Sequence, residues 1–130
     1  MKFLLDTNFL IGVLRKDKNY LSKSEEIKKN TLYASPLTIT ELYAGCRENE
    51  IQETGNLLKQ IRVLPLTKFI SREAGKLIYF YSKRGKKIHI ADAIIGATAK
   101  LHHLTLLTQN IKDFPMLFPS QIEEFPNLIN

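Results

Sequence analysis

The chain has 130 residues, of which 44% are hydrophobic and 25% are charged, a composition that excludes a disordered or fibrous chain. No apolar run approaches the ~18 residues of a membrane-spanning helix, and no signal-peptide pattern is visible at the N-terminus. The net charge of +6 favours acidic partners, nucleic acid first among them. We therefore expect a single domain over residues 1–130, and the lone cysteine, Cys46, indicates the reducing cytoplasm.

The chain opens on an apolar run over residues 3–5, which is typical of a strand buried on both faces of a sheet. Asp6 follows where this strand should end, and Thr7 and Asn8 favour a turn or a helix cap. Open parallel sheets bind ligands outside the carboxyl ends of their strands, so Asp6 stands where function is expected. The alternative is that Asp6 only caps the helix that begins near Phe9.

Helices and strands alternate along the rest of the chain, which implies a parallel sheet covered by helices, a three-layer α/β fold with four to five strands. A capping-box pattern from Ser22 to Glu25 begins one of the helices. Ile51 and Phe69 are expected on the inward faces of two others, and Gly85 in a left-handed cap. In chain order, the predicted elements are a helix over 9–14, a helix over 22–29, a strand over 31–34, a helix from 36, a helix over 49–61, a strand over 62–66, a helix over 69–81, a helix over 90–102 and a strand over 104–107.

Four acids fall where strands end or helices begin. Besides Asp6 they are Glu41, after the second strand, Asp92, in the first turn of the helix over 90–102, and Asp113, shortly after the last of these strands. In a parallel sheet these positions share one edge, so we expect the side chains to gather there. Each also has an ordinary structural role. The Glu41 carboxylate could complete a capping box, Asp92 could complement a helix dipole, and Asp113 could lie in a solvated turn.

Carboxylates that converge in this way need a cation. Two of them ~4 Å apart repel by about 4 kcal/mol at an effective dielectric constant near 20, so three or four must bind a cation or take up protons. Carboxylate oxygens are hard ligands, and the sequence has no cysteine pair or spaced histidine pair for zinc. We therefore expect Mg²⁺ or Mn²⁺, which keeps several waters and stays open to a substrate phosphate.

Four segments of the sequence, in order, resemble the PIN-domain ribonucleases, and specifically the VapC toxins of bacterial and archaeal toxin–antitoxin pairs. They are residues 4–8 (LLDTN), 35–45 (SPLTITELYAG), 90–99 (IADAIIGATA) and 106–114 (LLTQNIKDF). Each motif is weak alone, but together they cover the chain from end to end. The resemblance implies a metal-dependent endoribonuclease that forms a homodimer and binds a small VapB-type antitoxin. It also implies RNA products that end in a 5′-phosphate and a 3′-hydroxyl.

The resemblance also assigns roles to single residues. It implies that Asp6, Glu41 and Asp92 are the core catalytic and metal-binding carboxylates, and that one or two ions activate water. Many family members carry an acid where this chain has Asn110, and others use the acid three residues later, so we expect Asp113 to be the fourth. The supporting residues implied in the same way are Thr7, Asn8, Thr108 and Asn110.

A basic run over residues 83–87 (KRGKK) immediately precedes the segment of Asp92. One hypothesis is that Arg84, Lys86 and Lys87 grip the backbone of an RNA substrate beside the acidic site. The alternative is that they end a helix and cover a solvated loop. The nearby aromatic residues Tyr79, Phe80 and Tyr81, and Tyr43 before them, are expected in the core or in a subunit contact rather than as stacking platforms for bases.

Three other functions fit an α/β domain with acids at its strand ends. A signalling receiver would carry adjacent acids after the first strand, and a haloacid-dehalogenase-like phosphatase would carry Asp-x-Asp there. Here Asp6 stands alone, with Asn8 two residues on. A catalytically weak PIN-like module that only binds RNA remains the third alternative, and the presence of Asp6, Glu41 and Asp92 speaks against it.

Overall fold

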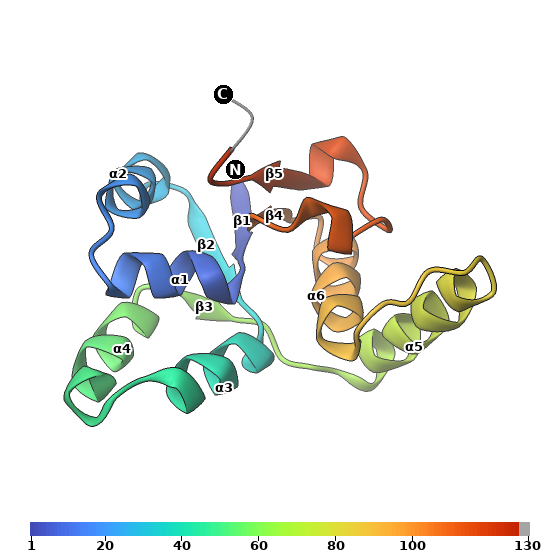
Figure 1. The fold of residues 1–130 in the computed structure, drawn as a ribbon, viewed down its shortest axis with the longest axis horizontal. Coiled ribbons are helices and arrows are strands. Elements are labelled where there is room, and N and C mark those ends of the chain that lie inside the picture. Colours follow the sequence, from blue (N-terminus) through green and yellow to red (C-terminus); the bar gives the residue numbers. More distant parts are fainter. Residues whose placement is uncertain (128–130) are drawn as a thin grey trace.

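The centre of the computed structural model, which describes residues 1–127, is a five-stranded parallel sheet (Figure 1). Its strands are β1 (Lys2–Leu5), β2 (Thr31–Ala34), β3 (Arg62–Val63), β4 (Thr105–Thr108) and β5 (Ile122–Glu124). They lie in the order β3-β2-β1-β4-β5. The chain thus moves outward from β1 to β3, then returns to add β4 and β5 on the other side of β1. The order reverses between β1 and β4, which makes this the topological switch point of the sheet.

Helices cover both faces of the sheet, so the predicted three-layer α/β fold is confirmed (Figure 1). On one side lie α1 (Thr7–Leu14), α2 (Lys18–Ile27), α3 (Pro36–Gly45) and α4 (Ile51–Leu58). On the other lie α5 (Lys68–Ser82) and α6 (Ile90–Leu101). Within residues 1–127 there are also three short 3-10 turns: η1 (Glu48–Glu50), η2 (Ile111–Asp113) and η3 (Pro119–Gln121). Among residues 1–127, no helix combines the length and apolar character that crossing a membrane requires.

The apolar runs of β1 and β4 are explained by burial on both faces. Alternate side chains of a strand point to opposite faces. Leu4 and Leu106 belong to the core beneath α5 and α6, whereas Phe3, Leu5 and Leu107 belong to the core beneath α1 and its neighbours. All five side chains are buried. Strands β1 and β4 therefore have no face in contact with solvent, and their polar residues lie at the strand ends.

Two helix starts differ from the prediction. α2 begins at Lys18 rather than near Ser22, because Asp17 caps it and accepts a hydrogen bond from Asn19 N at 3.0 Å. The capping box predicted at Ser22 is therefore wrong. The helix predicted over 49–61 is divided into η1 and α4, and the strand predicted over 62–66 pairs only at its first two residues. Gly85 has φ of 77°, which confirms the left-handed cap.

On the inward faces predicted for two helices, one position each is wrong, while the remaining positions are buried or pack against the core. Ile51 and Phe69 are exposed, and the inward position in α4 is taken by Thr54, which is 0% exposed. Thr54 Oγ1 donates to Glu50 O at 2.9 Å, so its hydroxyl is satisfied inside the helix. Of the two positions expected for the aromatic residues, the core is excluded for Tyr43, Tyr79 and Phe80, which are exposed, and a subunit contact stays a prediction for them. Tyr81 packs against the core beneath α5 and α6.

Gly12 allows α1 and α2 to pack closely. A Cβ atom at this position would collide with the ring of Tyr20. That ring has little freedom to move, because its centroid lies 5.7 Å from Phe9 and 5.1 Å from Phe125 in an aromatic cluster. By contrast, a Cβ atom at Gly75 in α5 would meet open space within 4 Å.

We expect these two glycines to respond oppositely to alanine. Gly12→Ala should lower the free energy of unfolding by about 1–3 kcal/mol, because overpacking against Tyr20 outweighs the gain in helix propensity. Gly75→Ala should raise it by up to about 1 kcal/mol, since only propensity changes. Urea denaturation of both variants measures the difference, and a Gly12→Ala protein as stable as wild type would contradict the packing argument.

Candidate functional site

Asp6 lies at the carboxyl end of β1, at the switch point of the sheet. Leu5 pairs with Leu107 in the parallel ladder, so the next residues of the two strands, Asp6 and Thr108, are neighbours. Thr108 Oγ1 donates to Asp6 Oδ2 at 2.6 Å, and Asp6 N donates to Leu107 O at 3.2 Å. Asn110 N in turn donates to Thr108 Oγ1 at 3.1 Å. The position of the Asp6 carboxylate is thus fixed by the two central strands and by the loop after β4.

Asp6 is also the N-cap of α1, since its Oδ1 accepts from Thr7 N at 2.8 Å. The two roles weighed from the sequence are therefore compatible. One oxygen of the carboxylate caps α1, and the other accepts the hydrogen bond from Thr108. Because an ionised carboxylate has about four lone-pair sites, both oxygens keep acceptor capacity.

Glu41 is joined to Asp6 through a single residue. Thr7 Oγ1 donates to Glu41 Oε1 at 2.7 Å and lies 3.2 Å from Thr38 Oγ1 in a second hydrogen bond. The capping box considered for Thr38 and Glu41 is wrong, because α3 is capped by Ser35, which accepts from Leu37 N at 3.1 Å. Thr38 is instead buried inside α3. Thr7 thus uses its backbone for one acid and its hydroxyl for the next.

Asp92 and Asp113 complete the acidic edge. Asp92 lies half-buried in the first turn of α6, and Asp113 ends η2. The pKa of Asp92 is raised chiefly by burial, and next by the charges of Asp113 and Asp6, while His89 opposes the rise. Glu41 adds a smaller increase. The charges of all three other acids therefore raise the pKa of Asp92.

The pKa of Asp6 is raised by the same causes. Burial is the largest, and the hydrogen bonds from Thr108 and Thr7 oppose it without overcoming it. The charges of Glu41 and Asp113 raise the pKa further. The four acids predicted from the sequence therefore share one electrostatic environment at the carboxyl edge, as the parallel topology requires.

The donor set at this edge fits a hard cation in its chemistry. All the charged donors are carboxylate oxygens, which Mg²⁺ and Mn²⁺ prefer. Because these carboxylates are partly buried and repel one another, a bound cation would stabilise their charged forms. Within residues 1–127, however, no three Asp, Glu, His or Cys side chains are gathered into a group that could hold a metal ion. Asp6 and Glu41 direct oxygens at Thr7 and Thr108 instead.

Some residues expected at the site take other positions. Asn8 is exposed in α1, and no hydrogen bond links it to an acid within residues 1–127. Asn110 acts through its backbone N–H on Thr108. In the basic run, Lys86 Nζ donates to Lys112 O at 3.3 Å, beside Asp113, and Lys87 is exposed in the loop before α6.

Two participants were not assigned from the sequence. Thr38 is 0% exposed and supports Thr7, which holds Glu41. A threonine three residues before an acid suggested only a cap. The second is His89, whose charge lowers the pKa of Asp92. Its position as the residue before α6, three before Asp92, was the available signal.

We expect Asp6→Asn to stabilise the metal-free protein at neutral pH. The folded pKa of Asp6 is raised above its ordinary 3.8, so its contribution to stability is complete below 3.8 and is lost as pH rises through the folded value. Asparagine removes that loss and is also a good N-cap. Thermal unfolding in EDTA should show a higher midpoint for Asp6→Asn at neutral pH, and this advantage should shrink as pH approaches 3.8.

The matched control is Asp17→Asn, which makes the same change at the exposed cap of α2. It should leave the unfolding midpoint nearly unchanged at every pH. An Asp6→Asn protein that is less stable than wild type at neutral pH would show that the hydrogen bonds of Asp6 outweigh its burial.

Comparison with known proteins identifies the family. The PIN domain family model matches residues 3–115. Ribonuclease VapC10 of Mycobacterium tuberculosis is 34% identical over 116 residues, covering 87% of this chain and 86% of that protein. Ribonuclease VapC2 of Haemophilus influenzae is 27% identical over 131 residues, covering 96% and 98%.

Solved structures agree with this assignment. VapBC-1 from nontypeable Haemophilus influenzae superposes with a TM-score of 0.79 at 25% identity, over 95% of this chain and 98% of that one. The crystal structure of VapBC2 from Rickettsia felis bound to a promoter DNA fragment gives a TM-score of 0.81 at 23% identity, over 96% and 99%. The chain therefore belongs to the PIN-domain family and, within it, to the VapC ribonucleases.

Proposed function

We propose that this protein is a metal-dependent endoribonuclease that acts in the cytoplasm as the toxin of a VapBC-type toxin–antitoxin pair. The observation that carries the proposal is the arrangement of acids at the carboxyl edge, where Thr108 holds Asp6 at 2.6 Å and Thr7 holds Glu41 at 2.7 Å. The raised pKa values of Asp6 and Asp92 agree with it. The relatives named ribonucleases support RNA as the substrate.

Asp6, Glu41, Asp92 and Asp113 would hold one or two Mg²⁺ or Mn²⁺ ions. A bound ion neutralises the carboxylates, activates water and stabilises the charge on the phosphodiester that is cut. Thr108 keeps one oxygen of Asp6 oriented, and Thr7 fixes the spacing of Asp6 from Glu41. Either Glu41, which is exposed beyond its bond to Thr7, or Asp113 would orient or deprotonate the attacking water.

We assign the fourth acidic position to Asp113 rather than to Asn110. The charge of Asp113 raises the pKa values of both Asp6 and Asp92. Asn110 supports the site through the backbone donor that it offers to Thr108, which any residue except proline would supply. Its side chain makes no hydrogen bond to an acid within residues 1–127.

The expected partners are a cognate VapB-type antitoxin and a second copy of the chain. Support for the antitoxin comes from the structures this chain resembles, which are VapBC complexes and the FitAB complex of a related toxin system. An acidic edge on a protein with a net charge of +6 suits a partner that places a cationic group there.

We expect the purified, antitoxin-free protein to cleave total cellular RNA with Mg²⁺ or Mn²⁺ and to stop when EDTA is added. Asp6→Asn and Asp92→Asn should each reduce the cleavage rate by at least roughly 100-fold, because each removes a charged metal ligand. Gel analysis of the RNA measures the rates, and Asp17→Asn serves as the matched control that should cleave normally. Vigorous cleavage by either site variant, or in EDTA, would contradict the mechanism.

A second pair of variants separates the fourth acid from its neighbour. Asp113→Asn should lower kcat by roughly tenfold or more, because it removes a negative charge from the edge. Asn110→Ala should change kcat little, since its backbone N–H still donates to Thr108. Initial rates on a defined RNA give both values, and the opposite ranking would assign the fourth position to Asn110. RNA binding without cleavage by the wild-type protein would favour a PIN-like binding module.

A further inference from the structure

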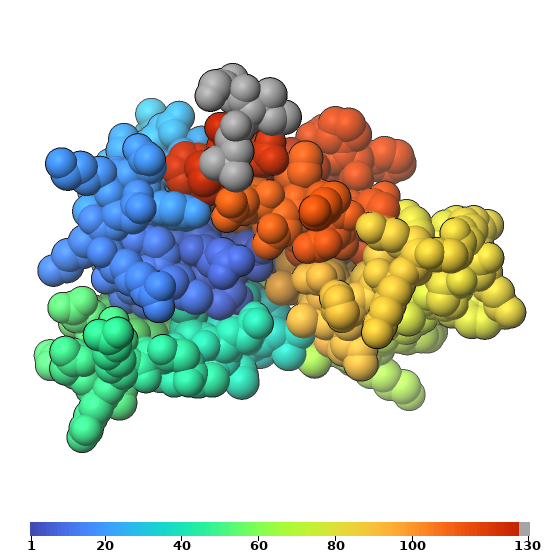
Figure 2. Space-filling view, viewed as in Figure 1, coloured from blue at the N-terminus to red at the C-terminus, as the bar shows by residue number. Residues whose placement is uncertain are grey.

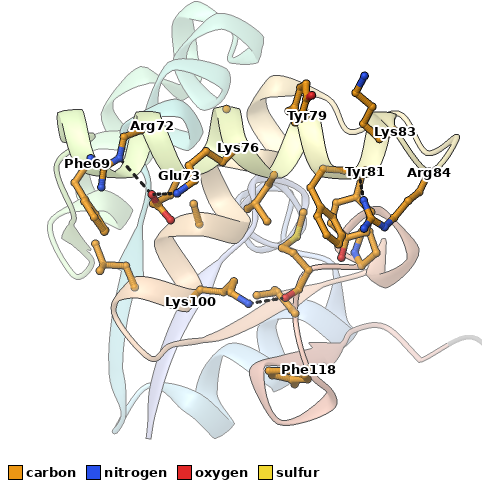
Figure 3. A pocket seen from close by; sticks show the side chains of 18 residues that line it. Phe69, Arg72, Glu73, Lys76, Tyr79, Tyr81, Lys83, Arg84, Lys100 and Phe118 are labelled. Carbon is orange, nitrogen blue, oxygen red and sulfur yellow. Dashed lines mark hydrogen bonds and ion pairs between the residues drawn. The ribbon is translucent and has the colours of Figure 1, made fainter.

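A groove separate from the acidic edge lies between α5, α6 and the segment that follows η2. Figure 3 shows it from close by, with α5 along one side and Lys100 and Phe118 opposite. Its volume is ≈ 1070 Å³, and none of the four acids of the edge lines it. Pockets for small ligands occupy about 300–1,000 Å³. The groove is therefore large enough for a segment of a polymer.

Aromatic rings line this groove and face solvent. Phe69, Tyr79, Phe80 and Phe118 are 44%, 65%, 44% and 67% exposed. Single exposed rings are ordinary, but a group of four around one groove indicates a binding surface. No element of residues 1–127 covers the outer faces of these rings.

Each ring is paired with a cation. The distances from the cationic group to the ring centroid are 5.0 Å for Arg72 over Phe69, 5.2 Å for Lys83 over Tyr79, 3.6 Å for Arg84 over Phe80 and 5.4 Å for Lys100 over Phe118. At 3.6 Å the guanidinium group of Arg84 lies directly against its ring. Each ring remains at least 44% exposed beside its cation, and a guanidinium plane is itself a surface on which a base stacks.

The stripe along α5 is regular. Positions 69, 72, 76, 79 and 83 lie on one side of the helix at alternating spacings of three and four, and they carry Phe, Arg, Lys, Tyr and Lys. At 1.5 Å per residue, the distance from position 69 to position 83 is about 21 Å. Two rings and three cations are thus interleaved over a length that several nucleotides could follow.

The charge of the groove selects an acidic occupant. Its lining carries five cationic side chains and the single carboxylate of Glu73, which lies 3.4 Å from Arg72 and 3.6 Å from Lys76. Within residues 1–127, no carboxylate forms an ion pair with Lys83, Arg84 or Lys100. A second copy of the same face would bring like charges together, which disfavours self-association there.

We propose that this groove binds single-stranded RNA, with phosphates on the cations and unpaired bases on the rings. Aromatic side chains interleaved with cations are the usual platform for single strands, because every base offers a face for stacking. The proposal rests on the proposed function in taking RNA as the substrate. It adds a site that holds RNA away from the acids.

The groove also has a connection to the acidic edge. Arg84 stands at the end of α5, and the loop that follows carries Lys86, whose Nζ donates to Lys112 O next to Asp113. An RNA strand held along α5 therefore has a path of cations leading to the acids. In the basic run, Lys83 and Arg84 line the groove, and Lys86 lies between the groove and the edge.

Gly75 provides a test that removes no native contact. It lines the groove, and a Cβ atom there meets open space. Gly75→Glu places a carboxylate among the cations, and Gly75→Gln adds a neutral side chain of the same size. In EDTA, where the RNA stays intact, Gly75→Glu should weaken binding of a fluorescent single-stranded RNA by about tenfold and flatten its salt dependence. Gly75→Gln should bind almost as wild type.

The rings have a matched pair of their own. Tyr79→Leu keeps an apolar side chain but loses the stacking face, and it should weaken RNA binding by at least roughly fivefold. Tyr79→Phe keeps the ring and should bind as wild type. With metal present, both weakened variants should raise KM for a long RNA while kcat is retained, and cleavage of a substrate of a few nucleotides should be unchanged.

Distinct results overturn the proposal. If Gly75→Glu and Tyr79→Leu bind and cleave long RNA as wild type does, the groove does not hold RNA, although the proposed function stands. If Gly75→Glu turns a dimer into a monomer in sedimentation velocity, the groove is a contact between copies of the chain. If wild type cleaves no RNA but these variants still lose binding, the proposed function fails and the groove survives.

Discussion

The hydrogen bond from Thr108 to Asp6 is the contact on which the site depends. It exists only because β1 and β4 are neighbours in register, with Leu5 beside Leu107, at the one place where the strand order reverses. Burial raises the pKa of Asp6 although two hydrogen bonds oppose the rise. The sheet therefore holds a carboxylate where its charge is unfavourable, which is the condition under which it gains most from a cation.

The distribution of charge separates two surfaces of one small protein. The acids lie along the carboxyl edge of the sheet, with Thr7 linking Asp6 to Glu41, whereas α5 and its groove carry most of their charge as cations. A polyanionic substrate is repelled by the edge alone. The net charge of +6 offsets that repulsion only if cations lie along the approach, as those of α5 do.

Much of the fold could be predicted because strands buried on both faces leave continuous apolar runs, and their ends carry the only polar residues. Asp6 was identified in this way, and Asp92 was identified from its position in the first turn of a predicted helix. Helix faces were harder to predict. Periodicity places Phe69 on a stripe of α5, but it cannot say whether another element covers that stripe, and here none within residues 1–127 does. The bond between Thr7 and Glu41 joins residues 34 positions apart, which no local pattern indicates.

The attachment of α5 has a consequence for the timescale of motion. This helix packs mainly on α6 and is not part of the layer formed by α1 to α4 (Figures 1 and 2). Elements held by one neighbour open as separate cooperative units, below the free energy of global unfolding. Backbone amides of α5 should then exchange with solvent sooner than those of β1 and β4. An opening of this kind would expose Ile70 and Ala74, which are buried in the core, and exposed apolar side chains promote aggregation. An occupant of the groove that holds α5 in place would therefore also slow aggregation.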